Sequence, residues 1–158
     1  MNTQGLDTEK QVFFYEQEFY PLSNFSSFAI ERDGKVYPTS EHLYHAEKFI
    51  NKSHKEAIRA CRSAHEAFKL AHDLKQYVKS NWNEVKVGVM RQILWDKLSQ
   101  HPYVKKKLID SGDRELIENS WRDDFWGWGE SKNGTNQLGK LWMEIRGYYI
   151  QHKMEIIG

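Results

Sequence analysis

The side chains best suited to chemistry lie in the segment 37–49, which reads Tyr-Pro-Thr-Ser-Glu-His-Leu-Tyr-His-Ala-Glu-Lys-Phe. Pro38 disfavours a helical conformation for the residue before it, and Thr39 or Ser40 is suited to cap a helix that begins there. Glu41 then lies in the first turn, where free N–H groups and the helix dipole stabilise an ionised carboxylate. With histidine and tyrosine close by, this carboxylate can act as an acid–base group or a charge stabiliser. The alternative is that Glu41 only compensates the dipole, because acidic residues are common in first turns.

A second segment with chemical potential is the loop 123–136, in which indole rings alternate with glycines. Glycines allow the backbone to approach a ligand closely, and Trp126 or Trp128 can cover a base or another flat ring. A tightly folded loop whose indoles fill the core fits the same pattern equally well.

Several classes of protein are disfavoured by what the sequence lacks. It contains no GxGxxG, GxxxxGK[ST], HExxH or GxSxG motif, and its histidines are scattered, so we expect no bound metal and no cofactor. Cys61 is the only cysteine, which excludes an intrachain disulfide and favours a small core residue over a nucleophile.

The chain has 158 residues and a formal net charge of +1, which fits one domain without a strongly basic surface. We expect a single domain at 11–152, a flexible tail at 1–10 and a second tail at 153–158. The N-terminal residues lack the apolar run of a signal peptide, and no segment is long enough for a membrane span, so we expect a cytoplasmic protein with no membrane partner.

The pattern of apolar residues predicts a mainly α fold of the α+β class with a small β part near the N-terminal end. Asp33-Gly34 between two short apolar runs predicts a β-hairpin directly before the Glu41 helix. The other predicted elements are a strand at 11–16, a loop at 18–27, helices beginning at Ser40, Ser53, Ser63, Asn81 and Pro102, a strand at 115–119 and a last helix at 136–151.

An ordered set of short motifs resembles the NADAR (YbiA-like) family, from about residue 13 to residue 146 of the chain. Each motif alone is weak, but their order and spacing are specific. The motifs are Ser23-Asn24-Phe25, Pro38-Thr39-Ser40-Glu41-His42 with Lys48-Phe49, Asn81-Trp82, Met90-Arg91, Asp123 with Phe125-Trp126-Gly127, Asn136-Gln137-Leu138-Gly139, and Met143-Glu144-Ile145-Arg146.

This resemblance implies an N-glycosidase that hydrolyses the C–N bond between a (phospho)ribosyl group and a base or amine. The substrate classes it implies are the ribosylaminopyrimidine phosphates of the early riboflavin pathway and ADP-ribose attached to guanine. The chain departs from the family pattern at His45 and Glu47, where glutamines are expected, and at Asp124, Trp128 and 130–133. These departures bear on the substrate more than on the reaction.

The functional positions carried over by the resemblance are Glu41, Trp82, Asp123 and Trp126. Breaking an N-glycosidic bond builds positive charge at the anomeric carbon, which a carboxylate stabilises. We assign this role to Glu41, and we expect Asp123 to hold the ribose hydroxyls or assist the attacking water. The two indoles would stack on the base or shape its pocket.

Three further residues are candidates for substrate binding. Lys48 and Arg91 can bind a 5′-phosphate or pyrophosphate, and Lys48 can share a helix face with Glu41 because it lies two turns further on. Asn24 can donate a hydrogen bond to the ligand from the early loop. Ordinary surface charges, and a structural turn residue for Asn24, are the alternatives.

Two other classes of function stay open from the sequence. The chain could be a non-catalytic sensor or reader that binds ADP-ribose or NAD, or a helical interaction protein whose indoles form a protein interface. For an enzyme, the expected partner is a small phosphoribosyl or ADP-ribosyl substrate, or an ADP-ribosylated nucleic acid base. The sequence carries no signal for the oligomeric state.

Overall fold

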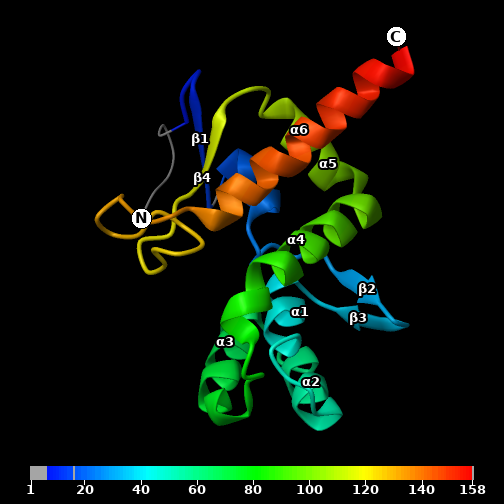
Figure 1. Cartoon of the computed structure of the whole chain (residues 1–158), viewed down its shortest axis with the longest axis vertical. Coiled ribbons are helices and arrows are strands. Elements are labelled where there is room, and N and C mark those ends of the chain that lie inside the picture. The colour runs from blue at the N-terminus through cyan, green and yellow to red at the C-terminus, as the bar shows by residue number, and fades with distance from the viewer. Residues whose placement is uncertain (1–6, 16, 158) are drawn as a thin grey trace. The chain divides into compact units, whose positions relative to one another are not determined.

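A computed structural model describes residues 7–15 and 17–157 and divides the chain into two compact units (Figure 1). Unit 1 runs up to Ser23 and resumes at Pro102, and unit 2 comprises Asn24–His101. Most of the expected N-terminal tail, residues 1–6, lies outside the described residues. Within the described part of the chain, no helix combines the length and the apolar character needed to cross a membrane.

Unit 1 is built on two parallel strands with a long helix packed against one of them. Its elements are β1 (Gln11–Phe14), the 3₁₀ helix η1 (Gln17–Leu22), α5 (Pro102–Asp110), β4 (Glu115–Glu118) and α6 (Gln137–Ile157). The register pairs Gln11 with Glu115, and α6 packs along β4. Trp142 of α6 is fully buried, and its indole N–H donates to the carbonyl of Leu22 over 2.9 Å. This hydrogen bond satisfies the polar end of a large core side chain.

Unit 2 is a helical cluster preceded by a β-hairpin. Its elements are β2 (Ile30–Arg32), β3 (Lys35–Tyr37), α1 (Ser40–Ala46), α2 (Lys52–Arg59), α3 (Ala64–Asp73), the 3₁₀ helix η2 (Lys75–Tyr77) and α4 (Trp82–Gln100). Helix α1 is the centre of the cluster, because it packs against α2, α3 and α4. Two of its apolar residues, Leu43 and Ala46, are fully buried.

The local signals in the sequence are confirmed where they depend on a few neighbouring residues. Asp33 and Gly34 adopt φ of 53° and 78°, the left-handed pair that a tight hairpin turn requires. The hydroxyl of Ser63 accepts the backbone N–H of Glu66, as expected at the start of α3. The α+β class with a small β part is confirmed as well.

Three expectations were wrong in detail. Part of the segment expected as a loop forms η1, in spite of Pro21. Helix α2 begins at Lys52 rather than Ser53, because Asn51 supplies the capping oxygen to Ser53 N–H. Helix α6 continues to Ile157, beyond the end at 151 expected for the last helix. The prediction of a single domain at 11–152 stays a prediction.

Candidate active site

Glu41 lies in the first turn of α1, and side chains and backbone from two segments fix this turn. Thr39 is the N-cap: its hydroxyl accepts the His42 N–H over 3.1 Å and lies 2.8 Å from Nδ1 of the same residue. The backbone carbonyl of Asn24 accepts the Glu41 N–H over 3.0 Å. Two of the N–H groups that a helix start leaves unpaired are thus satisfied, which holds the Glu41 backbone in place.

The carboxylate of Glu41 is bound on one side. Its Oε1 lies 2.6 Å from Nε2 of His45, four residues further along the helix. The Glu41 side chain is 12% exposed and that of His45 is 3% exposed. Among the described residues, Oε2 of Glu41 has no hydrogen-bond partner. One oxygen is therefore held by the protein, and the other is left for a ligand or water.

Aromatic rings surround this pair on the same face of α1. The Tyr44 ring lies 5.2 Å from the His45 ring, edge to face, and 5.2 Å from the ring of Trp82 at the start of α4. Tyr44 and Trp82 are 6% and 7% exposed. Trp82 is therefore brought close to Glu41 through Tyr44. Its expected role of stacking on a base stays a prediction.

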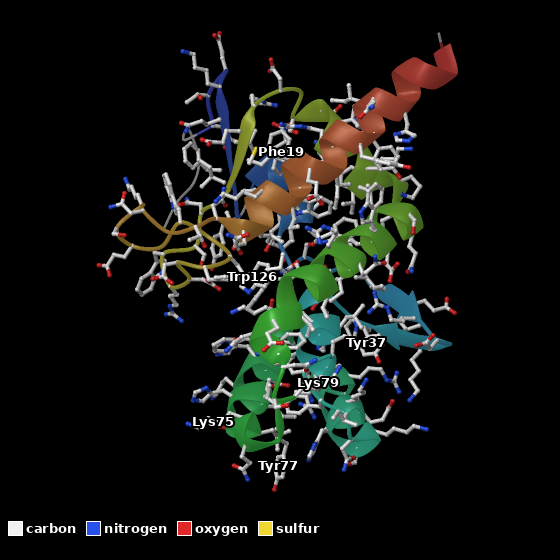
Figure 2. All side chains as sticks on the ribbon, viewed as in Figure 1. Phe19, Tyr37, Lys75, Tyr77, Lys79 and Trp126 are labelled. Carbon is white, nitrogen blue, oxygen red and sulfur yellow. The ribbon has the colours of Figure 1, made fainter. Side chains whose placement is uncertain are left out.

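Lys48 belongs to the same cluster. Its Nζ lies 5.3 Å from the centre of the Tyr44 ring. Burial lowers the pKa of Lys48 from its usual value, the nearby Glu41 carboxylate opposes this effect, and Lys86 adds to it. The Lys48 carbonyl accepts the N–H of Lys79, which Figure 2 labels in the segment between α3 and α4. A partly desolvated ammonium group held in this way is suited to an anionic ligand.

The other two expected ligand-binding residues of unit 2 are Asn24, which contacts α4, and Arg91, which belongs to α4. Asn24 is 5% exposed, and its Nδ2 lies 3.5 Å from Sδ of Met90. Its Oδ1 is buried without a hydrogen-bond partner among the described residues. Arg91 follows Met90 on α4 and is half-buried. Asn24 is therefore part of the Glu41 turn, whereas no contact described here joins Arg91 to Glu41.

Asp123 and Trp126 belong to unit 1, where they shape the loop before α6. Figure 2 labels Trp126. Oδ1 of Asp123 accepts the backbone N–H groups of Phe125 and Trp126 over 2.9 and 2.8 Å. This arrangement is an Asx-type turn. Trp126 is 9% exposed, and its ring meets that of Phe125 edge-on at 4.8 Å. The Asp123 carboxylate therefore has a structural role in its own loop, and a role in catalysis stays a prediction.

The rest of this loop favours the packing alternative. The carbonyls of residues 125, 126 and 127 accept the N–H groups of Gln137, Leu138 and Asn136, which caps the start of α6. A Cβ atom on Gly134 would lie 2.6 Å from the carbonyl oxygen of Asp124. The Trp128 indole N–H donates to Asn119 Oδ1 over 2.9 Å. Gly134 and Trp128 therefore serve the folding of the loop.

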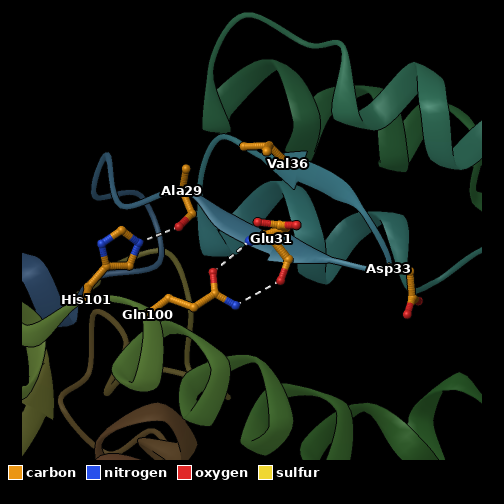
Figure 3. A pocket seen from close by; sticks show the side chains of 6 residues that line it. All are labelled: Ala29, Glu31, Asp33, Val36, Gln100 and His101. Carbon is orange, nitrogen blue, oxygen red and sulfur yellow. Dashed lines mark hydrogen bonds between the residues drawn. The ribbon is translucent and has the colours of Figure 1, made fainter.

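Unit 2 has two further features outside the set of predicted site residues. A hollow of about 580 Å³ is lined by Ala29, Glu31, Asp33, Val36, Gln100 and His101 (Figure 3), and none of these is a predicted site residue. Cys61 is half-exposed rather than a core residue. Burial, with a smaller effect from Glu66, raises the pKa of its thiol, which makes it a poor nucleophile at neutral pH.

Comparison with known proteins decides the family. The family model of the NADAR domain matches residues 13–148. The chain belongs to the NADAR family. It is 35% identical over 140 residues to N-glycosidase YbiA of Escherichia coli strain K12. The matched residues cover 89% of this chain and 88% of that protein.

The NADAR fold is also seen in a solved structure. The NMR structure of E. coli YbiA matches this chain with a TM-score of 0.84 and 34% identity, over 94% of this chain and 90% of that one. A longer NADAR relative is the riboflavin biosynthesis protein VVA0006 of Vibrio vulnificus strain YJ016. It is 34% identical over 146 residues, which are 91% of this chain and 40% of that protein.

Two residues that the sequence places near Glu41 were not assigned a role in the site. Tyr44 and His45 contact the predicted residues directly but were not among the predicted site residues. A signal was present, because residues four apart on a helix are neighbours, which placed His45 next to Glu41. The contact of the Asn24 carbonyl with the Glu41 N–H had no such signal, since the two residues belong to separate segments.

Proposed function

We propose that this protein, an N-glycosidase of the NADAR family, hydrolyses the C–N bond between a (phospho)ribosyl or ADP-ribosyl group and a base or amine. Relatives named N-glycosidase YbiA and riboflavin biosynthesis protein support this class of substrate. The observation that carries the proposal is the carboxylate of Glu41, with one oxygen held by His45 and the other without a partner among the described residues.

The proposed mechanism uses Glu41 as the charge stabiliser. As the C–N bond breaks, its electron pair leaves with the base or amine, and positive charge develops at the anomeric carbon. Water forms the new C–O bond and gives up a proton, which passes to the leaving nitrogen directly or through the carboxylate. With the carboxylate about 4 Å from the developing charge and an effective dielectric constant of about 20, the attraction is about 4 kcal/mol. This corresponds to a rate factor of about 10³.

The remaining site residues are proposed to bind the substrate. Lys48 would bind a phosphate group, since its ammonium group is partly desolvated and lies near Glu41. Arg91 would offer a second cation, with the geometry for a bidentate contact. Trp82 would border the base. Roles in substrate binding for Asp123 and Trp126 of unit 1 are implied by the family resemblance and stay predictions.

The family resemblance implies two substrate classes: free ribosylaminopyrimidine phosphates, and ADP-ribose attached to guanine in a nucleic acid. The formal net charge of +1 favours a small molecule or a single modified base over long contacts with a duplex. In both classes the reacting bond joins an anomeric carbon to nitrogen.

The experiment is a product assay by mass spectrometry that offers both substrate classes side by side to the wild type and to Glu41→Gln. We expect the wild type to release base from one class, and Glu41→Gln to be slower by about 10³-fold. Glu56→Gln is the matched control, because Glu56 lies on α2 with a 40% exposed side chain that pairs with Lys35 and Arg59. Near wild-type turnover by Glu41→Gln would refute the assignment. Binding without released base in the wild type would instead support a non-catalytic reader.

A further inference from the structure

His45 is held in one orientation beside the Glu41 carboxylate. Its side chain is 3% exposed, and its ring meets two others edge to face, Tyr44 at 5.2 Å and Phe68 of α3 at 5.8 Å. These neighbours from α1 and α3 restrict how the ring can turn. The 2.6 Å contact from Nε2 to Oε1 of Glu41 is thus set by packing.

The hydrogen-bond partners determine where the imidazole proton lies. An ionised carboxylate only accepts hydrogen bonds, so Nε2 must carry a proton to make this contact. The other ring nitrogen, Nδ1, is buried and has no hydrogen-bond partner among the described residues. If Nδ1 were also protonated, the ring would be charged and its Nδ1–H would be a buried donor without an acceptor. This costs more free energy than leaving an unprotonated Nδ1 without a hydrogen bond. The missing acceptor at Nδ1 opposes the stabilisation that the adjacent carboxylate gives an imidazolium, and it favours the neutral Nε2–H tautomer.

A neutral donor has a different effect on the carboxylate than a cation would have. An imidazolium would cancel the negative charge of Glu41, and the site already contains the nearby ammonium group of Lys48. A neutral Nε2–H fixes the carboxylate and leaves its charge uncancelled. It also occupies Oε1, so that Oε2 is the oxygen left for the reacting group.

We propose that His45 is a positioning residue which, as a neutral Nε2–H imidazole, fixes the Glu41 carboxylate in one rotamer and directs Oε2 at the anomeric carbon. Its effect on the rate rests on the proposed function. The tautomer and the hydrogen bond are properties of the folded chain and are testable without a substrate.

The first test is ¹⁵N NMR of the histidine side chains in the full-length protein at neutral pH. The sequence contains seven histidines, and the signals of His45 are assigned as those missing from His45→Gln. We expect Nε2 to be protonated and Nδ1 to be unprotonated. An imidazolium, or a proton on Nδ1 alone, would overturn the proposal whether or not the protein has the proposed activity.

The second test compares two substitutions kinetically. His45→Gln keeps an N–H donor, whereas His45→Leu removes it and fills a similar volume. We expect His45→Gln to stay within about tenfold of the wild-type kcat, and His45→Leu to lose a further factor of about 10–100 in kcat with KM little changed. His72→Leu on the exposed face of α3 controls for the general cost of this change.

Equal losses in His45→Gln and His45→Leu would overturn the positioning role, because the donor would then make no difference. An unchanged kcat in His45→Leu would overturn it as well. Thermal unfolding of each variant shows whether a loss comes from the fold. If the wild type releases no base from either substrate class, the proposed function fails, whereas the NMR result still decides the tautomer and the hydrogen bond.

Discussion

Lys97 on α4 allows a quantitative test of how burial of a charge affects stability. Its side chain is fully buried, its Nζ donates to the Ser26 hydroxyl over 2.9 Å, and the Phe28 ring centre is 5.8 Å away. Burial lowers the pKa of Lys97 from its usual 10.5 to about 7. Replacing this residue with methionine removes the charge and shortens the unbranched side chain by one heavy atom.

The sign of the effect follows from proton binding. Between about pH 7 and the usual pKa of 10.5, the folded chain has released the Lys97 proton and the unfolded chain still holds it. The free energy of unfolding therefore rises with pH in this window, by at most about 1.4 kcal/mol per pH unit. Below about pH 7 both states hold the proton, and the buried ammonium costs at most about 5 kcal/mol relative to the neutral amine.

The assay is urea unfolding of the wild type and Lys97→Met from about pH 6 to about pH 10. At the acidic end we expect Lys97→Met to have a greater free energy of unfolding than the wild type. The loss of the hydrogen bond to Ser26 lowers this advantage by about 1 kcal/mol. This advantage should shrink by several kcal/mol as the pH rises. Lys69→Met, at an exposed position of α3, is the control and should follow the wild type throughout. A constant difference between Lys97→Met and the wild type across the range would refute the reasoning.

Two further predictions concern backbone contacts near the loop before α6 and at the start of α1. A Cβ atom on Gly139 would overlap the carbonyl oxygen of Leu116, so Gly139→Ala should lower the free energy of unfolding by about 3 kcal/mol or more in urea titrations. Gly147 lies on the same helix, α6, and a Cβ atom there would meet no atom within 4 Å, so Gly147→Ala should be neutral or slightly stabilising. Equal losses of unfolding free energy in the two variants would contradict the steric argument. Thr39→Ala should cost about 1–2 kcal/mol by the same measurement and Thr39→Ser much less, whereas equal losses would show that the capping hydroxyl is unimportant.

Much of the fold could be predicted because its signals are local. A capping residue, a tight turn and an apolar helix face depend on residues within one or two turns of each other, as at Thr39, Asp33-Gly34 and Ser63. The misplaced start of α2 has the same origin: Asn51 and Ser53 are both good caps, and the sequence does not rank them. The parallel pairing of Gln11 with Glu115 was not predicted, because nothing local specifies a partner so distant in sequence.

The candidate site was predicted in part for the same reason. The place of Glu41 in a first helical turn could be predicted because a carboxylate after a cap is a local pattern, whereas its proposed role came from the family resemblance and stays a prediction. The buried environment of His45 depends on Phe68 of α3, and the pairing of the Asn24 carbonyl depends on the path of the preceding loop. Both are tertiary features. Asp123 was expected near a substrate, and its use by its own loop depends on turn geometry that its spacing alone does not specify.

The side-chain amide of Gln100 binds backbone groups at the edge of the β2–β3 hairpin. The Gln100 side chain accepts the N–H of Glu31 and donates to its carbonyl, both over 2.8 Å (Figure 3). On the other strand, Arg59 donates to the carbonyl of Val36 over 3.3 Å. These are groups through which an exposed strand recruits another chain. Side chains from the same molecule occupy them, so at these points the two-stranded ribbon is protected from intermolecular strand addition and from the aggregation it would seed.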